Sequence, residues 1–367
     1  MKNHVFRRSS PPRLSADFFR HAATCQCSRL RSGVSLVELL VTITMIALLM
    51  SLLLPVLGMA RESARRTYCS NNIRELAKGL ISYDTAGSGL PGWRNAVDGY
   101  TDAKLAAGAP SLAYVSWTVS VLPFIGENDL ADWYQEFTSG VPVDDITRKR
   151  VDLFVCPSAD GVTRSALCYM GNGGTGAETL IPETPPQQYR GDGAMLDVVG
   201  HGGYAAGRCS LEQIAIGDGG AGTILLAERC GLDTPRDVSW AAFALPTISG
   251  ERHQFETTHV VLQPPALASG QRPPPEARVI NPKAETLPAP SSDWAWRYPS
   301  SRHKGGAVAA FGDGHVNFLS EKIAPWVYCQ LMTSDKRHRS ARAAGWEHYP
   351  SNGDWVPYIL DDADIPR

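Results

Sequence analysis

VSLVELLVTITMIALLMSLLLPVL, residues 34–57, is the stretch of the sequence that decides the fold. From Leu39 to Ala60 the chain runs for 22 residues without a charged side chain. As an α-helix this run is about 33 Å long, which matches the ~30 Å hydrocarbon core of a bilayer. A buried helix of a soluble protein is the alternative, but its apolar stretch is ordinarily shorter. The sequence therefore predicts a transmembrane helix at residues 34–58.

The charges on either side of this helix predict its orientation. The whole chain has a formal net charge of −2, but residues 1–33 alone carry seven basic side chains and one acidic side chain. A basic arm before an apolar span stays in the cytoplasm, so the acidic remainder is expected to cross the inner membrane. The balance also gives no support for nucleic acid as a partner, since nucleic-acid binders carry a basic surplus.

An acidic residue, Glu38, lies near the start of the apolar run, where a carboxylate costs up to ~3 kcal/mol at full bilayer depth. The segment from Gly33 to Val41, GVSLVELLV, resembles the cleavage and methylation motif of type IV prepilins and pseudopilins. The resemblance implies that a prepilin peptidase cleaves after Gly33 and that the new N-terminal residue, Val34, is N-methylated. It also implies that Glu38 pairs with the amino terminus of a sister subunit during assembly.

An ordinary secretory signal is the alternative explanation of the same region. Gly58-Met59-Ala60 resembles a signal-peptidase site. However, the apolar core before it is longer than the 7–15 residues of a signal peptide, and Glu38 would have no role.

The apolar pattern changes after Pro55. Between Ala60 and Tyr83 apolar residues recur at spacings of three and four, at positions that include Ile73, Leu76, Ala77 and Leu80. This spacing predicts an amphipathic continuation of the helix that packs one face on a sheet. Glycine and proline at residues 87–92 are expected to end it.

The predicted fold class is α+β, with a long N-terminal helix packed on a mainly antiparallel β-sheet domain, as in pilins. Seven segments are candidate strands: 116–122, 153–156, 214–216, 223–227, 259–262, 307–311 and 315–319. The predicted organisation is a basic prepilin leader (1–33), a transmembrane helix (34–58), the extramembrane half of the helix (59–86), a periplasmic β-rich domain (87–262), a Pro-rich insertion (263–293) and the C-terminal part of the β-rich domain (294–367).

Cleavage of the leader would remove Cys25 and Cys27 and leave six cysteines. An even number in an oxidising compartment permits up to three disulfides, with fifteen connectivities. If residues 210–229 form a hairpin, Cys209 and Cys230 lie opposite each other at its open end and can form a disulfide. Free thiols and other pairings remain open. Because no C-x-x-C spacing occurs, no metal site is predicted from the cysteines.

A second set of short motifs follows the helix in a fixed order. They are Cys69-Ser70-Asn71-Asn72, Cys156-Pro157-Ser158, Asp218-Gly219 with Glu228, His303-Lys304-Gly305-Gly306, and Asp313-Gly314-His315. In this order the chain, from about residue 33 to 320, resembles domain of unknown function 1559, the prepilin-processing-associated family with a C-terminal His-x9-Asp-Gly motif. The activity of that family is undefined, so the resemblance implies location and architecture rather than chemistry.

The His303-to-Asp313 motif predicts a structural role. Residues 307–311 and 315–319 have the composition of two strands, and Gly312-Asp313-Gly314 suits a hairpin turn. Extended chain covers ~3.3 Å per residue, which keeps His303 far from Asp313 at the tip. We therefore expect Asp313 to fix the turn, and His303, Gly305 and Gly306 to shape the approach to the hairpin.

No nucleophile elbow, zinc-protease motif or phosphate loop is present, so we expect no enzymatic activity and no cofactor. The predicted function is a membrane-anchored pseudopilin-like subunit of a pilus-like or type II secretion assembly, with prepilin peptidase, sister subunits and inner-membrane lipid as partners. One alternative is an anchored module that binds calcium or stacks a glycan on C-terminal aromatic residues, which are otherwise expected to form a core over the helix. These C-terminal aromatic residues are Trp294, Trp296, Tyr298, Trp326, Tyr328, Trp346 and Trp355. A hydrolase built on His303, Asp218 and Asp313 is a further alternative.

Overall fold

The computed structural model describes residues 35–87, 89–96, 114–136, 149–159, 166–174, 193–196, 198, 207–230, 258–259, 279–281 and 298–335. The chain divides into two compact units, residues 1–57 and residues 58–367, which are described separately below. We refer to residues 58–367 as the body. The leader (1–33) and most of the Pro-rich insertion (263–293) lie outside the described residues.

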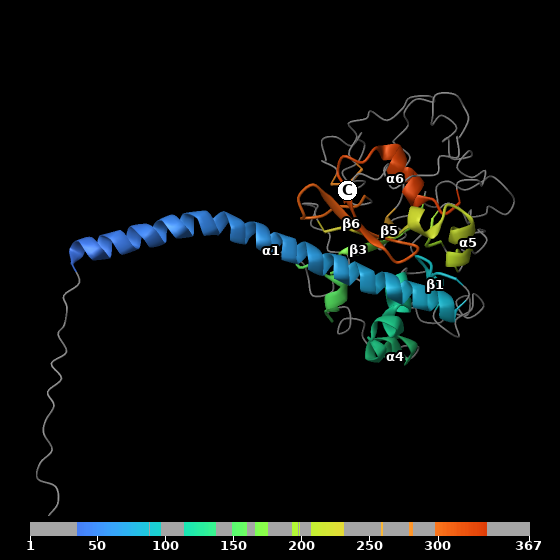
Figure 1. Ribbon diagram of the computed structural model, residues 1–367. Coiled ribbons are helices and arrows are strands. Elements are labelled where there is room, and N and C mark those ends of the chain that lie inside the picture. The colour runs from blue at the N-terminus through green and yellow to red at the C-terminus, as the bar shows by residue number, and fades with distance from the viewer. Residues whose placement is uncertain are drawn as a thin grey trace, which may run out of the picture. The chain divides into compact units, whose positions relative to one another are not determined.

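Helix α1, Leu36–Ala86, is 51 residues long and confirms the predicted long N-terminal helix (Figure 1). In its first part, residues 36–57, every side chain is exposed, and the large apolar ones range from 42% exposed at Val41 to 78% at Leu36. Among the described residues, α1 is the helix that is long and apolar enough to cross a membrane. Pro55 lies inside it, which a membrane helix tolerates.

The part of α1 that belongs to the body packs against the sheet domain. Ile73, Leu76, Ala77 and Leu80 are completely buried, which confirms the predicted apolar face. The helix ends at Ala86, immediately before the glycines that were expected to end it.

The body contains a sheet with strand order β5-β3-β4-β6-β7. Neighbouring strands from β3 to β7 in this order are antiparallel, while β5 pairs with β3 in parallel over two residues. The fold class is therefore α+β, with a helix packed on a mainly antiparallel sheet, as predicted. The strands are β3 (Tyr169–Asn172), β4 (Ile224–Glu228), β5 (Thr258–His259), β6 (Gly306–Phe311) and β7 (Val316–Ser320), and β1 (Asn95–Ala96) and β2 (Tyr114–Val115) form a separate pair.

Short helices complete the described part of the body. They are α3 (Trp117–Ser120), α4 (Asn128–Glu136), α5 (Leu211–Ile216) and α6 (Pro325–Met332), with 3-10 turns η1 (Leu122–Ile125), η4 (Asp152–Phe154) and η5 (Gly220–Gly222). Figure 1 shows α1 and α6 on opposite sides of the sheet.

Strand β6 separates two apolar cores because its residues alternate between the faces of the sheet. Val308 and Ala310 belong to the core that contains the α1 residues. Ala307, Ala309 and Phe311 belong to the core that contains α6. The strand is therefore buried on both faces, and its small side chains let a helix approach from each side.

Three of the predicted strands are wrong. Residues 214–216 belong to α5, which begins with a capping box in which Ser210 and Gln213 bond each other's backbone N–H. Residues 116–122 form α3 and the start of η1, while residues 153–154 belong to η4 and residues 155–156 follow it. These segments are rich in β-branched or aromatic residues, but the capping box in α5 and burial of most side chains at 116–122 override that local preference.

The aromatic residues near the C-terminus form a core, but in a different place from the prediction. Tyr298 and Tyr328 are buried, with ring centroids 6.5 Å apart, in the core on the α6 side of the sheet rather than over α1. The Trp326 side chain and the tryptophans at 294, 296, 346 and 355 lie outside the described structure.

Candidate functional site

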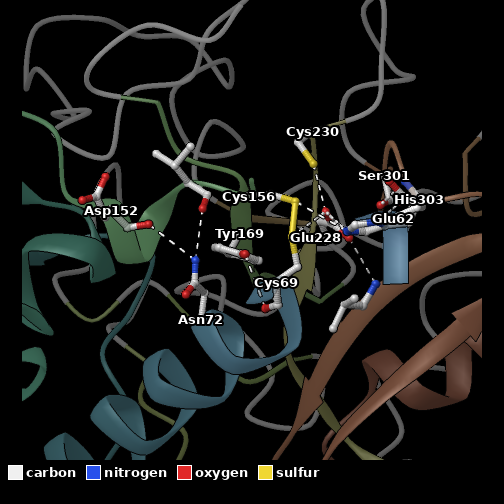
Figure 2. Close-up of a disulfide and its surroundings, with 12 residues drawn as sticks. Glu62, Cys69, Asn72, Asp152, Cys156, Tyr169, Glu228, Cys230, Ser301 and His303 are labelled. Atoms are coloured by element: carbon white, nitrogen blue, oxygen red, sulfur yellow. Dashed lines mark hydrogen bonds and ion pairs between the residues drawn. A yellow bond between two sulfur atoms is a disulfide. The ribbon is translucent and has the colours of Figure 1, made fainter. Parts of the chain in front are cut away.

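A disulfide between Cys69 and Cys156 joins α1 to the segment that follows η4 (Figure 2). Both cysteines are fully buried. The predicted bond between Cys209 and Cys230 does not form, and neither cysteine belongs to a disulfide. The reason is that residues 211–216 are helical, so residues 210–229 do not form the hairpin that would have placed the two cysteines opposite each other.

Glu228 is the last residue of β4 and is completely buried beside this disulfide. Its Oε1 accepts a hydrogen bond from the Cys230 thiol at 3.0 Å and lies 3.8 Å from Cys69 Sγ, while its Oε2 accepts one from Val308 N at 3.4 Å. Burial raises the pKa of Glu228, because the ionised carboxylate loses its hydration, and the nearby donors and His303 only partly oppose this effect.

His303 reaches the same cluster from the segment before β6 and is 2% exposed. Its Nδ1 lies 2.6 Å from Oε1 of Glu62, an α1 residue two turns before Cys69. Its Nε2 lies 3.6 Å from Cys156 Sγ and 3.7 Å from Glu228 Oε1. Figure 2 shows Glu228 beside the disulfide, with His303 and Glu62 next to it.

Potential ligand atoms of Cys69, Cys156, Glu228 and His303 all lie within 4.8 Å of one another. Thiolate sulfur, imidazole nitrogen and carboxylate oxygen are the ligand types of a zinc site, so this set could hold a metal ion once the Cys69–Cys156 disulfide is reduced. Sequence reasoning missed the cluster because its members come from four separate segments. One signal was available: Glu62 and Cys69 are seven residues apart and therefore share a helix face.

A second pair of cysteines, Cys168 and Cys230, adjoins the cluster, and both are free thiols. The hydrogen bond between the two thiols lowers the pKa of Cys168. The same bond raises the pKa of Cys230, as do burial and the charge of Glu228.

The hairpin of the His-x9-Asp-Gly motif forms as expected between β6 and β7. Asp313 lies in its turn, where its Oδ1 accepts a hydrogen bond from His315 N at 3.0 Å, and Gly314 follows with φ +85°. Asp218 instead accepts a hydrogen bond from Thr333 Oγ1 at 2.7 Å. The contacts of His303 are with Glu62, Cys156 and Glu228, and they include neither Asp218 nor Asp313.

The glycines of these motifs have identifiable steric roles. Gly219 and Gly305 have φ values of +86° and +89°, in the left-handed region that favours glycine. A Cβ at Gly306 would lie 2.0 Å from the Leu319 carbonyl oxygen on β7, so only glycine permits this approach at the start of the hairpin.

The predicted cleavage and methylation residues, Gly33 and Val34, lie outside the described residues. Glu38 lies in the first turn of α1, where its Oε2 accepts a hydrogen bond from Ser35 N at 3.1 Å. Its side chain belongs to the exposed apolar part of the helix.

Comparison with protein families gives one match over most of the body. A family model described as "Protein of unknown function (DUF1559)" matches residues 58–325, a range that includes every member of the buried cluster. No curated protein and no solved structure matches the chain.

Proposed function

The chain belongs to the DUF1559 family, and from that premise we propose that it is a pseudopilin-like structural subunit of a pilus-like or type II secretion assembly. Prepilin peptidase cleaves it between Gly33 and Val34, and Val34 is then N-methylated. The mature chain is anchored in the inner membrane by α1, and its body lies on the periplasmic or extracellular side. Its role is assembly rather than catalysis.

The observation that carries this proposal is the change of character along α1. The residues from 36 to 57 expose apolar side chains on every face, whereas the part within the body buries one face against the sheet. Soluble proteins rarely leave contiguous apolar surface of this extent in water, so lipid or the helices of other subunits must cover it. Such a helix can lie in lipid before assembly and pack against the helices of other subunits after assembly.

Glu38 supports assembly rather than simple anchoring. An ionised carboxylate within the hydrocarbon costs up to ~3 kcal/mol, and a hydrogen bond from Ser35 N satisfies only part of its capacity. A positive charge from a sister subunit, such as its new amino terminus, would offset this cost. Processing at Gly33 generates that amino terminus close to the depth of Glu38.

Two differently tagged copies of the full chain, co-expressed with a prepilin peptidase, test the proposal. We expect one tag to co-purify the other from mild detergent after cross-linking in the membrane, and Glu38→Ala to abolish this capture without preventing cleavage. The matched control is Thr42→Val, because the Thr42 hydroxyl only bonds the Leu39 carbonyl of its own helix.

Sequencing the mature N-terminus tests processing separately. We expect it to read from Val34 and the Gly33→Ala variant to remain uncleaved. A mature chain that begins at Arg61, or equal capture by the Glu38 and Thr42 variants, would contradict the proposal.

A further inference from the structure

The buried cluster brings together sulfur, imidazole and carboxylate groups whose potential ligand atoms all lie within 4.8 Å of one another. His303 Nδ1 faces the Glu62 carboxylate at 2.6 Å, which directs the other ring nitrogen, Nε2, into the cluster. Nε2 lies 3.7 Å from Oε1 of Glu228 and 3.6 Å from Sγ of Cys156. Such a convergence of donors favours a bound cation.

The distances match those of a tetrahedral zinc site. With Zn–S bonds of ~2.3 Å and Zn–N or Zn–O bonds of ~2.0–2.1 Å, neighbouring ligand atoms lie about 3.4–3.8 Å apart. Three ligand-to-ligand distances already fall close to this range: His303 to Cys156 at 3.6 Å, His303 to Glu228 at 3.7 Å and Cys69 to Glu228 at 3.8 Å. The two sulfurs must separate from their covalent bond to about 3.8 Å.

Neighbouring groups hold two of the proposed ligands in orientation. A carboxylate that accepts the other imidazole N–H orients a ligating histidine and raises its basicity, and Glu62 occupies that position. The backbone N–H of Val308 holds Oε2 of Glu228, which leaves Oε1 directed at the cluster. Glu62 comes from α1, the helix that also carries Cys69, and Val308 comes from β6.

We propose that the reduced chain binds one Zn²⁺ through Cys69, Cys156, His303 and Glu228. Binding involves no electron transfer: each of the two thiols releases a proton and forms one zinc–thiolate bond. A chain whose disulfide has formed must first take up two electrons and two protons from a dithiol, which becomes a disulfide itself. Zinc and the Cys69–Cys156 bond are therefore alternative ways of joining α1 to the body.

The test uses the full chain purified in detergent, with Cys25 and Cys27 of the leader replaced by serine so that they contribute no ligand. The protein is reduced with a dithiol, freed of reductant without oxygen, incubated with Zn²⁺ and desalted. Elemental analysis is expected to find one zinc per reduced chain and none in the oxidised chain. With Co²⁺ in place of Zn²⁺, a thiolate-to-cobalt charge-transfer band is expected.

Variants identify the ligands and guard against simple unfolding. Cys156→Ser should lose the cobalt–thiolate intensity of one sulfur, and Glu62→Gln should bind zinc ~10–100-fold more weakly. Cys209→Ser is the matched control, since this buried thiol lies outside the cluster, and it should bind like the parent. Glu62 is partly exposed, so its variant should fold even where cysteine variants fail.

Two results would overturn the proposal. The first is a reduced chain that keeps its circular dichroism spectrum but binds no zinc. The second is stoichiometric zinc that persists when both Cys69 and Cys156 are replaced by serine. Either outcome is independent of whether Glu38 mediates assembly, so the metal site and the proposed function stand or fall separately.

Discussion

Reduction of the Cys69–Cys156 disulfide should strongly destabilise the body. The two cysteines are 87 residues apart, so the bond closes a long loop in the unfolded chain. The chain-entropy relation for a loop of this length gives about 4.6 kcal/mol of stabilisation at 25 °C. Because domains are typically stable by only about 5–15 kcal/mol, reduction is expected to remove about a third or more of the body's stability.

Urea titration of the full chain in detergent measures this change through tryptophan fluorescence, to which the fully buried Trp117 contributes. EDTA is present throughout, so that bound metal cannot restore stability. With a slope of about 2.5 kcal/mol per molar urea, reduction should lower the midpoint by about 1.8 M.

The double variant Cys69→Ser/Cys156→Ser should unfold at the midpoint of the reduced parent and be insensitive to the reductant. Cys209→Ser should instead respond to reduction like the parent. A midpoint shift below about 0.4 M, or about 1 kcal/mol, would refute the loop-entropy argument for this bond.

Three further changes test other parts of the body by thermal unfolding. Because burial raises the pKa of Glu228, ionisation of this carboxyl destabilises the fold, and the Glu228→Gln variant should be more stable than the parent at pH 8. This advantage should shrink toward pH 4, where the carboxyl is protonated in both the folded and the unfolded chain. A stability difference that does not change with pH would contradict this. Gly306→Ala should lower the stability of the body far more than Gly305→Ala. A Cβ at Gly306 would lie 2.0 Å from a β7 carbonyl oxygen, whereas a Cβ at Gly305 would meet open space and cost only ~1–2 kcal/mol of backbone strain. Equal losses of stability in the two variants would exclude the steric explanation. Leu76→Ala should cost ~2–5 kcal/mol because the side chain is fully buried, and an unchanged midpoint would show that α1 does not pack on the sheet.

The parts of the fold that sequence reasoning predicted correctly are those determined by local pattern. The spacing of Ile73, Leu76 and Leu80 fixes the buried face of α1, and the turn chemistry around Asp313 fixes the β6–β7 hairpin. Residues 214–216 were assigned to a strand by composition, although the Ser210–Gln213 capping box was a stronger and equally local helix signal. Residues 116–122 gave no such signal, because their helical turns depend on burial by the rest of the body.

The candidate site could not be predicted in the same way. His303 and Glu228 were recognised as members of motifs, but their meeting depends on β4 and β6 being neighbours in the sheet. The pairing of Cys69 with Cys156 depends on how α1 crosses that sheet, and no spacing in the sequence encodes it. The incorrect Cys209–Cys230 pairing followed from a hairpin assumed where α5 forms.

The position of the disulfide also determines how the body would respond to mechanical load. A pull along α1 that reaches Cys69 passes through the covalent bond to Cys156, so the helix beyond Cys69 is shielded from the tension. Without the bond, the 87-residue stretch between the two cysteines could be drawn out to about 300 Å before the chain became taut. An oxidised subunit in a filament under tension would therefore hold its length, whereas a reduced one would yield.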